Sequence, residues 1–253
     1  MKYLAIIPAR YASTRFPGKP LAKLGGKLII QRVYERVSQL IDNTFVATDD
    51  ERILKAVENF GGKAVMTRTD HKSGTDRCQE VVEKLGAENY DVIINVQGDE
   101  PFIHPRQIEA LKACFDNPAT DIATLIKPFD KNAHIESLRN PNSPKVVIDN
   151  KGRALYFSRS VIPYLRGKEE SQWLQLHTYY KHIGLYAYRT NVLQEITRLP
   201  QSELEISESL EQLRWLENGY HIQTNITNIE TVGIDTPEDL QRAETFLKTQ
   251  PQF

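Results

Sequence analysis

The chain has 253 residues, of which 40% are hydrophobic and 26% charged, and its formal net charge is -1. This length allows a sizeable core. The nearly neutral balance gives no reason to expect nucleic acid or a membrane as a partner. No apolar run approaches the ~20 residues of a membrane span, and the short run before Pro8 does not resemble a signal peptide. Cys78 and Cys114 form no Cys-x-x-Cys pair, which favours buried free thiols. We therefore expect a soluble, cytoplasmic protein.

Strands and helices alternate over the first hundred residues. The apolar run at 3–8 is typical of a strand buried on both faces, and residues 28–41 have apolar side chains at helical spacing. The same patterns predict further strands at 44–50, 63–67 and 91–97, and further helices at 51–62 and 73–86. This alternation indicates β-α-β units and a mostly parallel sheet, and hence the α/β class.

Strands dominate from about residue 121 to residue 188. The predicted strands lie at 121–127, 145–149, 154–158 and 182–189, with a hairpin turn at 149–153. A helix is expected at 207–219, late strands at 220–227 and 230–234, and a final helix at 236–249 with Thr236 as its cap. Residues 163–180 fit no clear pattern, and a loop, a short helix or part of a subunit contact are the alternatives there. The expected architecture is one domain over 1–253, with a β-rich subregion at about 121–190.

The loop that follows the first strand is strongly basic. It carries five cations before the first acid of the chain, Glu35; these are Arg10, Arg15, Lys19, Lys23 and Lys27. Ligands of open α/β sheets bind at the carboxyl ends of the strands, where this loop lies. Glycines such as Gly18 let backbone N–H groups approach a ligand. The loop therefore predicts a polyphosphate cradle, although a solvated loop paired with distant acids is the alternative. It is not a Walker A motif, and the chain has no Gly-x-Gly-x-x-Gly.

Two acids follow other strands. Asp99 lies behind Gly98 after the strand at 91–97, and Asp235 stands between the last strand and the last helix. Mg²⁺ takes one or two protein carboxylates and completes its shell with water and phosphate oxygens, so this pair suits a magnesium site. Each acid could instead be an ordinary turn or helix-flanking residue. Asp49 and Asp50 are weaker candidates, because Asp50 is placed to cap a helix.

Seven motifs, in this order, resemble the family of 3-deoxy-manno-octulosonate (KDO) cytidylyltransferases. They are IIPARYASTRFPGKPL, VATDD, HKSGTDR, NVQGDEPFI, KHIGLYAYR, ESLEQLR and GIDTPEDL. The resemblance implies a nucleotide-diphospho-sugar transferase fold, a Rossmann-like α/β/α sandwich, whose β-rich subregion serves dimerisation. It also implies a homodimer that joins CTP and KDO into CMP-KDO and diphosphate for lipopolysaccharide synthesis, with Mg²⁺ as cofactor.

The resemblance also implies roles for particular residues. Arg10 and Lys19 would hold the triphosphate and, with Asp99 and Asp235 as magnesium ligands, form the catalytic set. The cytidine would lie near Ser73, Gly74 and Thr75, and the sugar acid would be lined by Gln97, Arg159, His182, Glu211 and Gln212. Without the resemblance, Arg159, His182 and Glu211 would be interpreted as ordinary surface positions, since charged side chains are mostly exposed.

Other functions are compatible with parts of this pattern. Another sugar-acid cytidylyltransferase, such as a CMP-sialic acid synthetase, shares the Pro-Ala-Arg…Lys element. A glycosyltransferase of the same fold class would commonly carry Asp-x-Asp after a central strand, and this chain does not. A non-catalytic nucleotide-binding module would bind CTP without releasing diphosphate.

Overall fold

The computed structural model describes residues 1–229 and 233–249. Contacts divide them into two compact units. The first unit comprises Met1–Ile108, Arg189–Thr197 and the described residues from 233 onward, and the second comprises Glu109–Tyr188 and residues 198–229. Within the described residues, no helix combines the length and apolarity that a membrane span requires. The assignment of 1–253 to one domain with a β-rich subregion at about 121–190 stays a prediction.

The first unit is built on a parallel sheet, which confirms the α/β class. Its strands lie in the order β6, β1, β4, β5, with bounds β1 Tyr3–Ala9, β4 Thr44–Thr48, β5 Ala64–Met66 and β6 Val92–Asn95. In β1, the four residues from Leu4 to Ile7 are inaccessible to solvent. Such a strand needs helices on both faces, because no side of it carries polar side chains.

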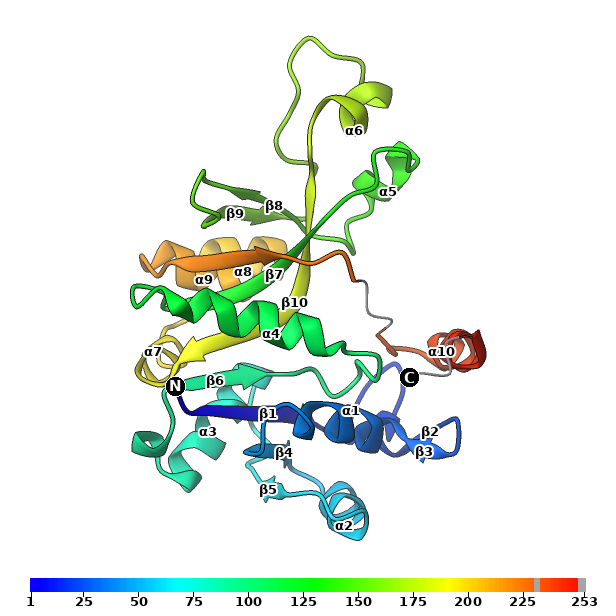
Figure 1. The fold of residues 1–253 in the computed structure, drawn as a ribbon, viewed down its shortest axis with the longest axis vertical. Coiled ribbons are helices and arrows are strands. Elements are labelled where there is room, and N and C mark those ends of the chain that lie inside the picture. Colours follow the sequence, from blue (N-terminus) through cyan, green and yellow to red (C-terminus); the bar gives the residue numbers. More distant parts are fainter. Residues whose placement is uncertain (230–232, 250–253) are drawn as a thin grey trace. The chain divides into compact units, whose positions relative to one another are not determined.

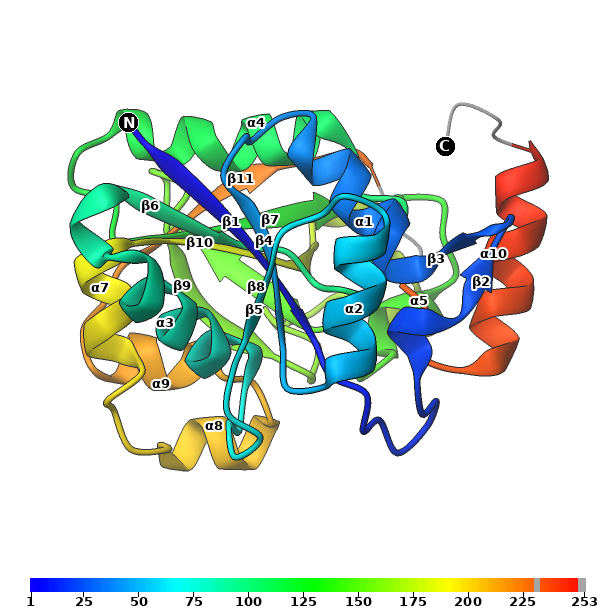
Figure 2. The same ribbon diagram turned by 90° about the horizontal axis from the view of Figure 1, so that it is seen from below.

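The helices of the first unit cover both faces of this sheet. They are α1 (Ile29–Ser38), α2 (Glu51–Asn59), α3 (Gly74–Leu85) and α7 (Thr190–Ile196). Helices α1 and α2 lie on one face and α3 on the other (Figures 1 and 2). Helix α7, which the sequence reading missed, packs against α3 and β6. The side chain of Asp50 caps α2 and that of Ser73 caps α3, which confirms both predicted helix starts.

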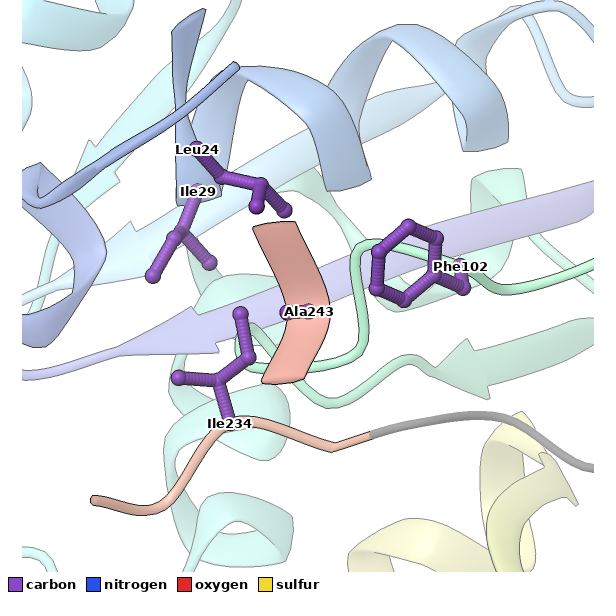
Figure 3. Packing of buried hydrophobic residues seen from close by; sticks show 5 residues of the cluster. All are labelled: Leu24, Ile29, Phe102, Ile234 and Ala243. Atoms are coloured by element: carbon purple, nitrogen blue, oxygen red, sulfur yellow. The ribbon is translucent and has the colours of Figure 1, made fainter. Parts of the chain in front are cut away.

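The end of the chain packs against the loop after β1. A short 3-10 helix (Lys19–Leu21) and the strands β2 (Lys23–Leu24) and β3 (Lys27–Leu28) occupy that loop. Helix α10 (Pro237–Thr249) begins at the predicted Thr236 cap, whose hydroxyl accepts the Asp239 N–H at 3.2 Å. Figure 3 shows Ala243 of α10 among buried side chains of the loop, of α1 and of the chain before α10; the cluster is Leu24, Ile29, Phe102, Ile234 and Ala243. The strand expected at 230–234 falls largely outside the described residues.

The second unit contains the strands that make the later chain β-rich. Strand β7 pairs in parallel with β11 and antiparallel with β10, and β8 and β9 form the predicted hairpin around 149–153. The bounds are β7 Ile122–Pro128, β8 Lys145–Ile148, β9 Ala154–Ser158, β10 Tyr180–Arg189 and β11 Ile222–Ile226. Helix α4 (Pro105–Ala113) leads into this unit and was not anticipated. Further 3-10 turns lie at Cys114–Asp116 and Glu170–Gln172 in this unit and at Ala87–Asn89 in the first unit.

The helix expected at 207–219 is wrong in its extent, because the chain breaks there into two helices. Helix α8 (Glu203–Glu208) starts earlier, at a capping box between Ser202 and Glu205, and α9 (Gln212–Glu217) follows after Ser209. Ser209 has φ 49°, a left-handed backbone conformation that residues other than glycine rarely adopt. The guanidinium of Arg159 donates to the carbonyl oxygens of Glu208 and Ser209, so a tertiary contact holds the break open.

Residues 163–180, which fit no sequence pattern, have a small core of their own. It involves α5 (Ile135–Arg139) and α6 (Trp173–Leu176), and its buried members are Leu138, Trp173, Leu174 and Tyr179. These side chains come from separate segments, so no local periodicity could have indicated the cluster. Both cysteines are buried thiols outside any disulfide, as predicted.

Candidate active site

A pocket of about 290 Å³ lies in the first unit at the carboxyl ends of β1 and β6. This is the edge at which open α/β sheets bind ligands. Four parts of the chain line it: the loop after β1, the start of α3, the turn after β6, and the residue that precedes the cap of α10. The lining residues are Pro8, Ala9, Arg10, Ser13, Arg15, Lys19, Pro20, His71, Lys72, Ser73, Gly74, Arg77, Gln97, Gly98, Asp99 and Asp235.

The loop after β1 is folded back on itself around Tyr11. The Gly18 N–H donates to the Tyr11 carbonyl oxygen at 2.9 Å, and Gly18 has φ 72°. A Cβ atom at Gly18 would lie 3.1 Å from the Tyr11 ring, on whose ring the Arg52 guanidinium also stacks, 3.4 Å from its centroid. Glycine therefore suits the positive φ, and a Cβ atom here would press against the Tyr11 ring. This turn starts the 3-10 helix at Lys19 and directs the Lys19 side chain into the pocket.

The two predicted metal-binding acids converge on Lys19. Its Nζ lies 2.6 Å from Asp99 Oδ2 and 3.1 Å from Asp235 Oδ1, and its side chain is only 13% exposed. Arg15 adds a contact of 3.2 Å to Asp235 Oδ2. The backbone brings the acids together, because the Ile234 N–H donates to the Asp99 carbonyl oxygen at 2.9 Å. Two carboxylates are thus held around one cation.

Gly98 allows the turn that carries Asp99 to approach β1 closely. A Cβ atom at this position would lie 2.7 Å from the carbonyl oxygen of Pro8, closer than real Cβ atoms come to a backbone atom. Gly98 is also buried. Any side chain here would push the turn away from β1 and move Asp99 away from Lys19.

The donor set of this site fits Mg²⁺. Two carboxylates gather around a single point, and within residues 1–229 and 233–249 no group of three or more His, Cys, Asp or Glu side chains could hold a metal ion alone. Magnesium usually binds to one or two protein carboxylates and leaves its other positions for water and substrate phosphates. Asp99 and Asp235 are therefore the residues that would hold Mg²⁺. In this structure the Lys19 ammonium balances the charge of these two carboxylates.

The start of α3 forms the other end of the pocket. Ser73 and Asp76 form a capping box, in which the Asp76 N–H donates to Ser73 Oγ at 3.1 Å and the Ser73 N–H donates to Asp76 Oδ2 at 3.2 Å. Gly74 lines the pocket next to Pro8, whereas Thr75 is buried and does not line it. Of the three residues predicted near a cytidine, Ser73 and Gly74 therefore face the pocket.

Several lining residues were not anticipated by the sequence reading. Among them are Ser13, His71, Lys72 and Arg77. Arg77 is buried, and its Nη2 donates to Asp49 Oδ2 at 2.8 Å, so Asp49 has a structural partner inside the protein. The signal for His71 and Arg77 was present in the motif HKSGTDR, because they flank the residues already singled out there.

The other predicted substrate residues, apart from Gln97, belong to the second unit. Arg159 donates through Nε to Glu208 O at 2.6 Å, through Nη1 to Pro141 O at 2.9 Å and through Nη2 to Ser209 O at 3.2 Å. Three of its five N–H donors are thus used by backbone carbonyls, and two are left for a ligand.

Two of these residues, His182 and Glu211, interact with Tyr186. The rings of His182 and Tyr186 are 5.2 Å apart, and burial, with a contribution from the charge of Glu211, raises the pKa of Tyr186 well above its ordinary value. Gln212 is buried, and within the part of the chain described its Nε2 has no hydrogen-bond partner. Tyr186 was not singled out from the sequence.

His182 is a neutral imidazole at neutral pH. Part of its surface is accessible, but Thr124 Oγ1 lies 3.0 Å from its Nε2 and the Phe157 ring packs edge-on at 5.1 Å. Burial among these groups lowers the pKa of His182 to about 3, because the charged form loses hydration. The ring can therefore donate or accept one hydrogen bond but supplies no positive charge.

Comparison with known proteins identifies the family of the chain. A family model described as "Cytidylyltransferase" matches residues 4–240. A solved cytidylyltransferase from Leptospira borgpetersenii has the same fold, with a TM-score of 0.60, 13% identity and coverage of 100% of this chain and 96% of that one. The fold and the matched family define a cytidylyltransferase, and hence a nucleotidyltransferase.

More similar proteins narrow the family. The 3-deoxy-manno-octulosonate cytidylyltransferase of Bacteroides thetaiotaomicron is 64% identical over 99% of this chain and 100% of its own length, and that of Phocaeicola vulgatus is 66% identical over 98% of both. A solved CMP:2-keto-3-deoxy-manno-octonic acid synthetase complexed with CTP gives a TM-score of 0.90 at 44% identity, with 99% and 100% of the two chains covered. The chain belongs to the 3-deoxy-manno-octulosonate cytidylyltransferase family.

Proposed function

We propose that the protein transfers CMP from CTP to the anomeric hydroxyl of KDO and releases diphosphate, a step in lipopolysaccharide synthesis. Support comes from the relatives named above, which carry this activity in their names, and from a solved relative that holds CTP. The observation that carries the chemistry is the convergence of Asp99 and Asp235 on Lys19 in a pocket lined by further cations. An enzyme for sialic acid is not favoured by these relatives.

The cationic side chains of the pocket would bind the triphosphate. Arg10 and Arg15 are exposed at the rim, and Lys19 lies deeper. When CTP enters, Lys19 can exchange its two carboxylate partners for phosphate oxygens. Lys19 and Arg10 then stabilise the negative charge that collects on the diphosphate as it leaves. Attack on the α-phosphorus needs in-line positioning and charge neutralisation more than covalent help.

Asp99 and Asp235 would hold Mg²⁺, the proposed cofactor. When bound, the ion supplies neutralisation of phosphate charge and lowers the pKa of a coordinated hydroxyl. The role of the two aspartates is to fix its position against the loop that carries Lys19 and Arg10. Ser73 and Gly74 would face the nucleoside, and Gln97 would stand beside the reacting atoms.

The sugar acid would be recognised by Arg159, His182, Glu211 and Gln212. The two free N–H donors of Arg159 suit the carboxylate of KDO. The neutral ring of His182 and the acceptor oxygens of Glu211 suit its hydroxyls. The amide nitrogen of Gln212, which has no hydrogen-bond partner among the described residues, can donate to one of them.

A homodimer in the cytoplasm is the proposed working form, as the family resemblance implies. The second unit offers candidate contact residues, because Tyr164 and Leu176 expose 74% and 55% of their surfaces. Light scattering after gel filtration tests the dimer, and a monomeric mass over the working concentration range excludes it.

Diphosphate release tests the proposed reaction. The protein is incubated with CTP and Mg²⁺, separately with KDO, with sialic acid and with no sugar. We expect release with KDO alone. Release with sialic acid but not KDO would instead indicate the other sugar-acid cytidylyltransferase, and CTP binding without release in any arm would indicate a non-catalytic module.

A further inference from the structure

One wall of the pocket is held by charged side chains from a single face of α3. The segment from Met66 to Lys72 runs from the end of β5 to the cap of α3 and is called here the 66–72 segment; its last two residues, His71 and Lys72, line the pocket. The side chains that hold it are Arg77, Glu80 and Lys84, which recur at i, i+3 and i+7 and therefore point the same way. Their contacts reach backbone and side-chain groups all along the segment.

Arg77 secures the first half of the 66–72 segment. Its Nη1 donates to the Thr67 hydroxyl and, at 3.2 Å, to the Arg68 carbonyl oxygen. Asp49 balances its charge from the end of β4 at 2.8 Å. Arg77 is 4% exposed, so these bonds form away from water. Arg77 also lines the pocket, so a substitution of Arg77 would not distinguish a positioning role from direct contact with the ligand.

Glu80 secures the second half and does not line the pocket. Its Oε2 accepts the Arg68 N–H at 2.9 Å and is hydrogen-bonded to Nε2 of His71, while Lys84 Nζ lies 2.7 Å from Oε1. Burial alone would raise the pKa of Glu80, but hydrogen bonds from Lys84, the Arg68 N–H and His71 outweigh it and lower the pKa to about 2. The Glu80 carboxylate is therefore ionised at neutral pH. Lys84 also holds the start of the 66–72 segment, because its Nζ donates to the Met66 carbonyl oxygen at 2.7 Å.

The residues so fixed lie at the nucleoside end of the pocket. His71 is nearly inaccessible, with 7% of its side chain exposed, and yet it lines the pocket beside Ser73 and Gly74. The contacts of Lys19, Asp99 and Asp235 form a separate set on the loop after β1 and the turn after β6. A disturbance of Glu80 should thus reach the nucleoside end and spare the phosphate end.

We propose that Glu80 is a positioning residue for the nucleoside moiety of the substrate, acting through His71 and the 66–72 segment without touching the nucleotide. The inference rests on the proposed function, because it takes the ligand of this pocket to be a cytidine nucleotide. It extends that function by assigning nucleoside affinity to a residue outside the pocket. Fixing a side chain before the ligand arrives removes an ordering cost from binding, which is how such a residue improves affinity.

The test measures binding of CMP, which carries the nucleoside but lacks the two outer phosphates. Calorimetry with Glu80→Gln is expected to show about tenfold weaker binding of both CMP and CTP, with binding of inorganic diphosphate and the KM for KDO unchanged. The matched control is Glu83→Gln, an exposed glutamate on the same helix that accepts from Gln79. It should change none of these values. Lys84→Met, which removes the partner of Glu80, provides a second variant and should weaken CMP binding by a smaller factor.

A double-mutant cycle shows whether Glu80 acts through His71. If it does, Glu80→Gln should cost less than about threefold in CMP affinity when His71 is already alanine. Full additivity in the cycle, unchanged CMP affinity in a folded Glu80→Gln protein, or an equal loss for diphosphate overturns the inference. If the wild-type protein binds neither CMP nor CTP, the proposed function itself fails.

Discussion

Lys19 shows most directly how single side chains define this site. Its ammonium is surrounded by two carboxylates that come from positions 80 and 216 residues further along the chain. Sequence reasoning predicted all three residues, because each follows a strand of the α/β pattern. It could not predict that Lys19 pairs with both acids, since that depends on the bond between Ile234 and Asp99. The roles of these residues in binding and catalysis stay predictions.

Asp99→Asn is expected to lower turnover at least 100-fold and to leave the fold intact. The amide keeps the size of the side chain but is a much weaker ligand for Mg²⁺ than a carboxylate, while Lys19 keeps its contact with Asp235. Diphosphate release measures turnover, and circular dichroism checks the fold. Asp116→Asn, at an exposed position, is the control. Near-normal turnover in a folded Asp99→Asn protein would rule out the metal assignment.

Lys19→Met should have opposite effects on two ligands. It should raise the KM for CTP, because a phosphate-binding cation is lost. It should also strengthen Mn²⁺ binding about tenfold in the absence of nucleotide, since Asp99 loses its counter-charge and Asp235 keeps only that of Arg15. Electron paramagnetic resonance of free Mn²⁺ measures the second effect. Lys27→Met, which removes a cation paired with Glu35, is the control. Weaker Mn²⁺ binding in Lys19→Met would contradict this account.

At the scale of elements, the predicted features are those with local causes. Periodicity and caps gave α1, α2, α3 and α10 close to their observed bounds. The helix expected at 207–219 failed because Arg159, from a distant segment, holds Ser209 in a left-handed conformation between α8 and α9. The core around Trp173 escaped prediction for the same reason, because its members come together only in the folded chain.

The turn after β6 should tolerate no side chain at Gly98. Gly98→Ala would place a methyl group 2.7 Å from the Pro8 carbonyl oxygen. We expect a loss of about 1–3 kcal/mol in the free energy of unfolding, together with a large loss of activity as Asp99 moves. Urea denaturation measures the first effect. Gly184→Ala is the control, because a Cβ there meets nothing within 4 Å. Equal urea midpoints for the two variants would show that the turn accommodates a Cβ atom at position 98.

For the whole molecule, two groups with large pKa shifts contribute to the dependence of stability on pH in the acid range. His182 has a pKa near 3 in the folded protein against an ordinary value of 6.5, and Glu80 has about 2 against 4.5. In both cases the unfolded chain binds the proton more readily, so folding is weakened as pH falls. The contribution of His182 is lost between about pH 6.5 and 3, and that of Glu80 between about 4.5 and 2.

The two windows can be separated with His182→Gln. Between pH 7 and pH 5 only His182 of this pair titrates in the unfolded chain. The urea midpoint of the wild-type protein should therefore fall over this interval by more than that of His182→Gln. His134→Gln, at an exposed position, should behave like the wild type. Parallel pH profiles for wild type and His182→Gln would show that burial of His182 does not govern stability.

The backbone hydrogen bond between Ile234 and Asp99 also has a consequence for synthesis of the chain. A ribosome supplies Lys19 and Asp99 well before Asp235. Until the segment that carries Asp235 has been made, the acidic pair stays half assembled. A protease that removes this segment should therefore abolish activity, because Lys19 would keep one carboxylate partner instead of two.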